Sequence, residues 1–522
     1  MTAGLPFSEV GEIVKGIATR RREFILVLIA LGQFCLIVNS SWNATPDSAL
    51  YLSLGESLAR GAGYAFNGEP HTLVPPGFPS ILAVVARLLG PDFLSYRLLM
   101  ALMGLLAAGF GYLFVTRLCG RDTAMLVGSV FVLNHALLYN STLVLADVPY
   151  ALFTLIALNA ALSAAERPDA NLWVIIAGLL MGITPLIRIN GIALPLSTAL
   201  FFYYSWMGMS RPKFWLRMLV FLLLAFGPFF LWQYWKAGFP LSESEGNYLS
   251  SVIGRTWSYQ LSVVIGTLIY YFPETSFALS GVSLKTGFLE LALPILTIVG
   301  MAQAFRKGDR LLVPLTVLQF CGLLLTTAGS RYVIFLLPGL YLFLALGVLE
   351  CAALLGRKFA RFSSRSKVLV IFFLALAITN VGGNMNTIWQ ARNPVESKGA
   401  ESERSLPFFT AARWLRANAP ETILLTTRPR IMSYLTGLKT VSLVRSGVPY
   451  DQIWLDTERL GKLILDTKPG FLFIDSKDAV YYSLVVRGIE SLGYQLKEIT
   501  EAVPTADYHL FRLIRIGESR AP

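Results

Sequence analysis

Four charged residues stand where long apolar stretches of the sequence end, and their types could do chemistry. Asp47 follows the first apolar run, Asp147 lies in "LVLADVPYALF", Arg188 in "PLIRINGIALP" and Arg331 in "TAGSRYVIFLLPG". A carboxylate can accept a proton, and a guanidinium group can bind an anion through several N–H donors. If the fold brings these positions to one surface, they would form a polar site at a membrane–water interface.

Each of these residues also has a plainer structural interpretation. Asp47 could cap the helix "SALYLSLGESL", and Asp147 could be a helix cap two residues before Pro149. Arg188 and Arg331 could anchor helix ends at the membrane interface. Glu69 and His71, in "NGEPHTLVPPGFP", could be ordinary loop residues. The coincidence of the charged residues on one face is stronger evidence for a site than any one of them.

The composition indicates the elements that must position these residues. Of 522 residues, 55% are hydrophobic and only 15% are charged, and the mean hydropathy is +0.59. Soluble proteins are nearer one quarter charged. We therefore expect an α-helical polytopic membrane protein with about eleven transmembrane helices. The predicted spans are 24–41, 96–117, 122–139, 143–164, 172–187, 190–207, 214–236, 288–305, 310–328, 332–354 and 367–386.

One apolar segment, Pro75 to Gly90, is predicted to lie in the interface rather than to cross. Its roughly 16 residues would span only about 24 Å as a helix, against about 30 Å for a hydrocarbon core. With this segment lying flat, most loop lysines and arginines fall on one side, which the positive-inside rule makes cytoplasmic. The first outer loop (42–95), the second long outer loop (237–287) and the tail then face outward. The net charge of +12 is explained by these loops and does not indicate nucleic acid.

The last part of the chain, 387–522, reads as a small soluble α/β domain after a membrane domain of residues 1–386. "TILLTT", "KTVSLV", "FLFID", "YQLKEIT" and "YHLFRLIR" alternate as strands do, with helices at 451–467 and 479–492 between some of them. "FFTAARWLRANAP" predicts a helix with Thr410 as its N-cap. We find no phosphate-binding loop or nucleophile elbow there, so the domain is interpreted as a recognition or support module.

The first outer loop, "NATPDSALYLSLGESLARGAGYAF" followed by "PPGFP", resembles that of GT-C fold glycosyltransferases, of the protein O-mannosyltransferase and lipid A aminoarabinose transferase type. "LADVPYALF", "IRINGIALP" and "SRYVIFLLPGLYLFLALG" resemble later parts of the same pattern, as does an outward C-terminal domain. The resemblance covers roughly residues 24–350.

The resemblance implies an inverting glycosyltransferase at the outer face of a bacterial cytoplasmic membrane. A polyprenyl-phosphate-linked sugar is the donor, and a glycan, lipid or protein hydroxyl is the acceptor. Asp47 is the implied catalytic base. Arg188, Arg331, Tyr332 and Asp147 are the implied residues for the donor phosphate, with Arg255 in reserve and Glu69 and His71 as possible loop contacts. The N-terminus would be cytoplasmic.

The sequence departs from the family pattern at two places. Some relatives carry an acidic pair where this chain has Asp47 and Ser48, and the aminoarabinose transferases carry lysine where this chain has Val74. The first loop has no D-x-D motif, so no metal cofactor is expected, although Asp47, Asp147, Glu69 and His71 could approach one another.

Three alternative functions stay open at this point. A transporter or flippase would place charged residues near the bilayer midplane, and a polymerase of outer-leaflet glycans would share the donor chemistry. A non-catalytic membrane scaffold would use Asp47 only as a helix cap.

Overall fold

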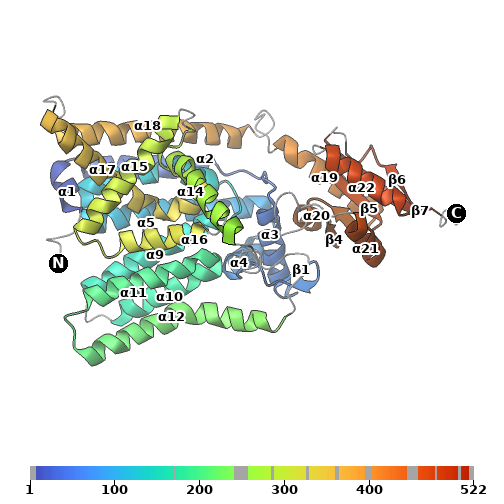
Figure 1. The fold of residues 1–522 in the computed structure, drawn as a ribbon, viewed down its shortest axis with the longest axis horizontal. Coiled ribbons are helices and arrows are strands. Elements are labelled where there is room, and N and C mark those ends of the chain that lie inside the picture. The colour runs from blue at the N-terminus through green and yellow to red at the C-terminus, as the bar shows by residue number, and fades with distance from the viewer. Residues whose placement is uncertain are drawn as a thin grey trace.

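The computed structural model of the chain describes residues 7–167, 171–239, 257–283, 287–324, 329–358, 364–393, 402–443, 457–476, 479–503 and 507–516. A helical membrane domain forms one end of the elongated molecule, and a small α/β domain forms the other (Figure 1). The helices of the membrane domain are α1 (Ser8–Ile13), α2 (Arg20–Leu36), α3 (Pro46–Ala59), α4 (Gly77–Leu89), α5 (Phe93–Cys119), α6 (Arg121–Thr123), η1 (Ala124–Gly128), α7 (Ser129–Val132), α8 (His135–Asn140), α9 (Asp147–Glu166), α10 (Asn171–Ile187), η2 (Ile189–Ile192), α11 (Ala193–Ser205), α12 (Arg211–Ala237), α14 (Trp257–Ser280), α15 (Gly287–Arg306), α16 (Leu312–Leu323), η3 (Ser330–Leu336), α17 (Leu337–Lys358) and α18 (Arg365–Arg392).

Several of these helices match predicted spans. Within the described residues, five helical segments are long and apolar enough to cross a membrane: α5, α9, α12, Ser330–Leu355 and α18. Helices α4, α10 and α16 are apolar but shorter. Their lengths agree with a polytopic membrane protein, while the orientation of the helices in a bilayer stays a prediction.

One region expected to be a loop contains a helix, and one predicted span is interrupted. The segment 237–287, expected as a long outer loop, contains the 24-residue helix α14, which packs against α15 and η3. Its tyrosines, Pro273 and Glu274 lower its hydropathy, so an apolar-run criterion misses it.

The predicted span 122–139 is interrupted, with a π-helical turn at η1 and a break at Asn134, whose side chain accepts a hydrogen bond from the Leu137 amide.

The first outer loop consists of α3, a short hairpin and α4. The strands β1 (Ala65–Phe66) and β2 (Glu69–Pro70) form the hairpin between the two helices. Helix α4 packs one side on α3 and on the end of α10, and Val84 and Leu88 are exposed on its other side. Arg87 of α4 donates to the last carbonyls of α3, at Leu58 and Ala59. This satisfies acceptors that a helix end otherwise leaves open.

The C-terminal domain has a five-stranded mixed sheet, and all five predicted strand segments contribute to it. The strand order is β4-β3-β5-β7-β6, with β3 parallel to β4 and β5, and β7 antiparallel to β5 and β6. The elements of the domain are α19 (Ser402–Asn418), β3 (Leu424–Thr426), α20 (Pro429–Thr436), β4 (Thr440–Ser442), α21 (Thr457–Thr467), β5 (Phe471–Asp475), α22 (Ala479–Ser491), β6 (Tyr494–Glu498) and β7 (Tyr508–Arg515).

One helix boundary in this domain was predicted wrongly. Helix α19 begins at Ser402, so Thr410 lies inside the helix and donates to the Pro407 carbonyl instead of capping the N-terminus. The helix starts before the segment expected to be helical and continues through Pro407.

The two faces of the sheet belong to different cores. Leu425, Leu472 and Ile474 pack with the apolar sides of α21 and α22. Leu424 and Phe473, which alternate with them along the strands, belong to a core that continues into the membrane domain. The C-terminal domain is therefore joined to the rest of the chain by a shared apolar core, and α20 packs on α3 at this junction.

Candidate active site

Asp47 is the second residue of helix α3 and is not the cap of that helix. Thr45 is the N-cap, since its hydroxyl accepts from the Ser48 amide while the Ser48 hydroxyl accepts from the Thr45 amide. This reciprocal capping box fixes the first turn and leaves the Asp47 carboxylate free for other contacts. Its side chain is 46% exposed. The helix-cap interpretation of Asp47 is therefore wrong.

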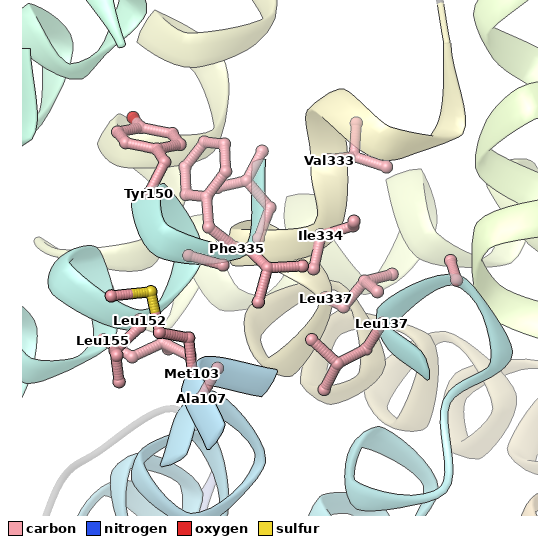
Figure 2. Packing of buried hydrophobic residues seen from close by; sticks show 14 of the residues in the cluster. Met103, Ala107, Leu137, Tyr150, Leu152, Leu155, Val333, Ile334, Phe335 and Leu337 are labelled. Carbon is pink, nitrogen blue, oxygen red and sulfur yellow. The ribbon is translucent and has the colours of Figure 1, made fainter. Parts of the chain in front are cut away.

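Arg331 and Tyr332 belong to the 3-10 turn η3. This turn is far from Asp47 in the sequence, but it lies next to Asp47 in the structure. Arg331 Nη2 lies 3.5 Å from Asp47 Oδ2 and donates to the Tyr332 hydroxyl at 2.9 Å. The turn is anchored by Val333, Ile334 and Phe335, which are buried beneath it (Figure 2). The ring of Phe335 packs edge-on against Tyr150 of α9, with centroids 4.8 Å apart. This packing holds the Arg331 guanidinium at the site.

Asp147 and Arg188 form an ion pair beside this group. Asp147 Oδ1 accepts from Arg188 Nη1, and the Asp147 side chain is almost completely buried. The Arg188 guanidinium also stacks 4.3 Å above the Tyr332 ring, and Arg331 lies 4.9 Å from the same ring. Tyr332 thus lies against both arginines, so the structure brings Asp47, Asp147, Arg188, Arg331 and Tyr332 together.

The backbone turn that presents Arg188 depends on two glycines. A Cβ on Gly191 would lie 2.6 Å from the Thr184 carbonyl carbon, and a Cβ on Gly77 would lie 2.7 Å from the Leu186 carbonyl. Both neighbours are backbone atoms and cannot rotate away. Gly77 is the first residue of α4. The close approach of Gly77 to the Leu186 carbonyl therefore positions the first outer loop beside the Arg188 turn.

Replacing Gly77 by alanine is expected to push α4 away from the Arg188 turn and to lower both stability and activity. Overpacking of this kind typically costs about 1–3 kcal/mol. Thermal unfolding of the purified protein measures the loss of stability. Gly109→Ala in α5 is the control, because nothing lies within 4 Å of a Cβ there. Equal unfolding midpoints for the two variants would show that the close approach is unimportant.

Two residues at the site were not found from the sequence. Arg430 of α20 places Nη1 3.3 Å from Asp47 Oδ1. Tyr51 lies one helical turn after Asp47, and its ring packs edge-on against Phe78 at 5.1 Å. Burial raises the pKa of the Tyr51 phenol, with Arg188 and Asp47 also acting on it, so it stays protonated as a donor. The i+4 spacing from Asp47 could have indicated Tyr51, but no local signal indicates Arg430.

Two other candidate residues, Glu69 and His71, have contacts outside this group. Glu69 is exposed on β2 and pairs with Lys439 of the C-terminal domain at 3.7 Å. The buried His71 accepts from the Val74 amide through Nε2, which shapes the loop before α4. Arg255 lies outside the described residues. Within the described part of the chain, no group of three or more His, Cys, Asp or Glu side chains is placed to hold a metal ion.

A second cluster joins α20 to α3 next to the site. Tyr434 donates to Glu56 Oε1 at 2.8 Å, and its ring packs edge-on against Trp42 with centroids 5.2 Å apart. Burial raises the pKa of Glu56, and the hydrogen bonds from Tyr434 and Tyr96 together with Arg60 oppose this rise only in part. The docking of the C-terminal domain on α3 therefore includes a carboxyl group whose pKa lies above its ordinary value.

This buried carboxyl predicts a pH dependence of stability. Between the ordinary pKa of a glutamic acid and the raised pKa of Glu56, the folded protein holds a proton that the unfolded chain releases. The free energy of unfolding therefore falls as pH rises through that window. We expect the unfolding midpoint to fall over this range, and to fall less in Glu56→Gln, with exposed Glu69→Gln as the control. Identical pH profiles for Glu56→Gln and the unmodified protein would contradict the assignment.

Comparison with known proteins agrees with the fold. Residues 73–232 match the family model described as dolichyl-phosphate-mannose-protein mannosyltransferase. ArnT from Cupriavidus metallidurans, in a crystal structure with undecaprenyl phosphate, superposes with a TM-score of 0.57 at 16% identity, over 97% of this chain and 100% of that one. The oligosaccharyltransferase AglB from Archaeoglobus fulgidus, in complex with an inhibitory peptide and a dolichol-phosphate, gives 0.55 at 12% identity, over 97% of this chain and 75% of that one. No curated protein sequence matches the chain.

The chain has the fold of GT-C membrane glycosyltransferases, and its residues 73–232 are similar to the mannosyltransferase family. The expected fold class, a helical GT-C membrane domain with a small C-terminal α/β domain, is confirmed. The part of the chain similar to the mannosyltransferase family, 73–232, runs from just before α4 into α12 and includes Asp147 and Arg188.

Proposed function

We propose that this protein is an inverting glycosyltransferase that moves a sugar from a polyprenyl-phosphate donor to an acceptor hydroxyl at the outer face of the cytoplasmic membrane. The observation that carries the proposal is the meeting of one half-exposed carboxylate, Asp47, with the Arg188, Arg331 and Tyr332 group. Such a transfer needs a proton acceptor and a stabiliser of the leaving anion. Asp47 can be the first, and the group of Arg188, Arg331 and Tyr332 can be the second.

In the proposed reaction, the acceptor oxygen attacks the anomeric carbon of the donor sugar. The bond from that carbon to the phosphate oxygen breaks, and its electron pair leaves with the polyprenyl phosphate. Asp47 takes the proton of the attacking hydroxyl as the new bond forms. Attack from the side opposite the phosphate inverts the configuration at the anomeric carbon.

Arg188 and Arg331 are the proposed stabilisers of the departing phosphate. Both guanidinium groups lie against the Tyr332 ring, so their N–H donors are held before a substrate arrives. Preorganised donors of this kind stabilise developing negative charge without reorganisation during the reaction. The ion pair with Asp147 fixes Arg188 further, because its carboxylate is buried at the start of α9. Neither arginine needs a metal ion for this role.

The neighbours support a lipid-linked donor. The ArnT structure holds undecaprenyl phosphate and the AglB structure holds dolichol-phosphate, and both share this fold. The exposed apolar side of α4, beside the Arg188 turn, is a suitable place for the start of a prenyl chain at the membrane surface. We propose that the site faces the periplasm or exterior, since the loop charges favour that orientation.

A donor panel tests the proposal. Purified protein in lipid nanodiscs is incubated with polyprenyl phosphates carrying different radiolabelled sugars and with crude envelope acceptors. Transfer from at least one lipid donor, and none from the matching nucleotide sugars, is the expected result. Transfer from nucleotide sugars alone would refute the donor assignment. A product made by joining two lipid-linked glycans would instead favour the polymerase alternative.

A further inference from the structure

The C-terminal domain reaches the Asp47 carboxylate through Arg430. Arg430 Nη1 lies 3.3 Å from Oδ1, and Arg331 Nη2 lies 3.5 Å from Oδ2. Each carboxylate oxygen therefore faces a different guanidinium group, one from the soluble domain and one from the membrane domain. Two charge-assisted contacts from separate directions restrict the orientation of a carboxylate more than one contact does.

Helix α20 holds Arg430 firmly in this place. The helix begins with Pro429 at its first position, and Gly437, in the left-handed region with φ of +74°, follows its last residue. Both are strong boundary signals, so its register is well defined. Ser433 donates to Asn67 Oδ1 at 2.6 Å, and Tyr434 donates to Glu56 Oε1 at 2.8 Å.

The spacing of these contacts shows that one side of α20 faces the first outer loop. Arg430, Ser433 and Tyr434 stand at positions i, i+3 and i+4, which share one side of a helix. They meet Asp47, Asn67 and Glu56, of which the first and last stand on α3. The Arg430 guanidinium is therefore fixed relative to the helix that carries Asp47. Its side chain is only 24% exposed, so it lies within the junction of the two domains.

We propose that Arg430 is a positioning residue through which the C-terminal domain completes the active site, by holding the Asp47 carboxylate in the orientation that receives the acceptor proton. The proposal rests on the proposed function of Asp47 and deepens it. It assigns the soluble domain a part in the reaction itself, beyond recognition or support. Misplacement of a reacting group by about 1 Å can cost about 100-fold in rate.

Kinetics of Arg430 variants test the proposal in the full-length protein. Arg430→Gln is expected to lower kcat about 10- to 100-fold and to leave the KM for the lipid donor nearly unchanged, because the proposed donor contacts stay in place. Arg430→Lys should recover part of kcat, since it keeps a positive charge. Lys439→Met is the matched control, because it breaks the Glu69 contact of the same domain without touching Asp47. A wild-type kcat in Arg430→Gln would overturn the proposal, and so would an equal loss in Lys439→Met.

A second measurement does not depend on activity. Unfolding midpoints of Asp47→Asn, Arg430→Gln and the double variant form a double-mutant cycle. We expect the shift of the double variant to be smaller than the sum of the single shifts, because both substitutions break the same contact. Additive shifts would show that the two residues do not interact and would overturn the inference. Failure of the donor panel alone would refute the proposed function, while the cycle would still report whether the contact exists.

Discussion

Replacing Asp47 by asparagine is expected to reduce sugar transfer about 100- to 10,000-fold, the range typical of a lost general base. Asparagine has nearly the same size but its amide does not accept the acceptor proton at neutral pH. Folding should be little affected, because Thr45 caps α3 and the Asp47 carboxylate is half exposed. Contacts of exposed ion pairs contribute only about 0–1 kcal/mol to stability. Single-turnover transfer from the donor identified in the panel measures the effect.

The matched control for Asp47 is Asp92→Asn at the start of α5. Asp92 accepts from the Ser95 amide as an N-cap, and asparagine caps a helix nearly as well. Both substitutions remove one carboxylate from the first outer loop, so they change the net charge equally. Full activity in Asp92→Asn with loss in Asp47→Asn assigns the effect to the site. Wild-type transfer in Asp47→Asn would mean that another group takes the proton.

Replacing Arg188 by methionine is expected to be the most destabilising change at the site. It leaves the Asp147 carboxylate, whose side chain is only 3% exposed, without its ion-pair partner. Breaking a buried ion pair from one side typically costs about 3–5 kcal/mol. The thermal unfolding midpoint and the yield of folded protein should both fall. The phosphate would also lose one of its two proposed guanidinium contacts.

The double variant Arg188→Met with Asp147→Asn separates these two effects. With no buried charge left unpaired, its stability should return close to that of the unmodified protein. Its transfer activity should stay low, because an oxyanion donor of this kind contributes about 100- to 1,000-fold to rate. A double variant as unstable as the single one would show that the ion pair is not the source of the instability. Recovered activity would remove Arg188 from the proposed phosphate site.

Much of this site could be predicted because local patterns and topology determine it. Apolar runs of known length end at Asp147, Arg188 and Arg331, so their positions along the helices follow from the sequence. The strand segments of the C-terminal domain also alternate clearly enough to be found one by one. Glu69 and His71 were weaker candidates, because a loop sequence does not show which way a hairpin folds. In the structure Glu69 pairs with Lys439, and His71 accepts from the Val74 amide.

Arg430 could not be predicted, because its contact depends on how two independently patterned domains dock. Helix α20 is eight residues long, and its sequence is that of an ordinary amphipathic helix. The partner of Arg430 lies 383 residues earlier in the chain. The shared core of Trp42, Tyr434 and the inner face of the sheet, together with the hydrogen bonds of Ser433 and Tyr434, brings the two together. Contacts of this kind follow from tertiary packing rather than from local sequence.

The long separation between Asp47 and Arg430 has a consequence for biosynthesis. A chain grows at about 5–20 residues per second, and its N-terminal parts fold first. After Asp47 is made, the 383 residues to Arg430 therefore take about 20–80 s to synthesise. Throughout this time the membrane helices can assemble while the carboxylate has no guanidinium from α20. Termination between α18 and α20 would leave a membrane-inserted chain whose site lacks this contact. The nascent protein thus acquires this contact only after the whole membrane domain has been made.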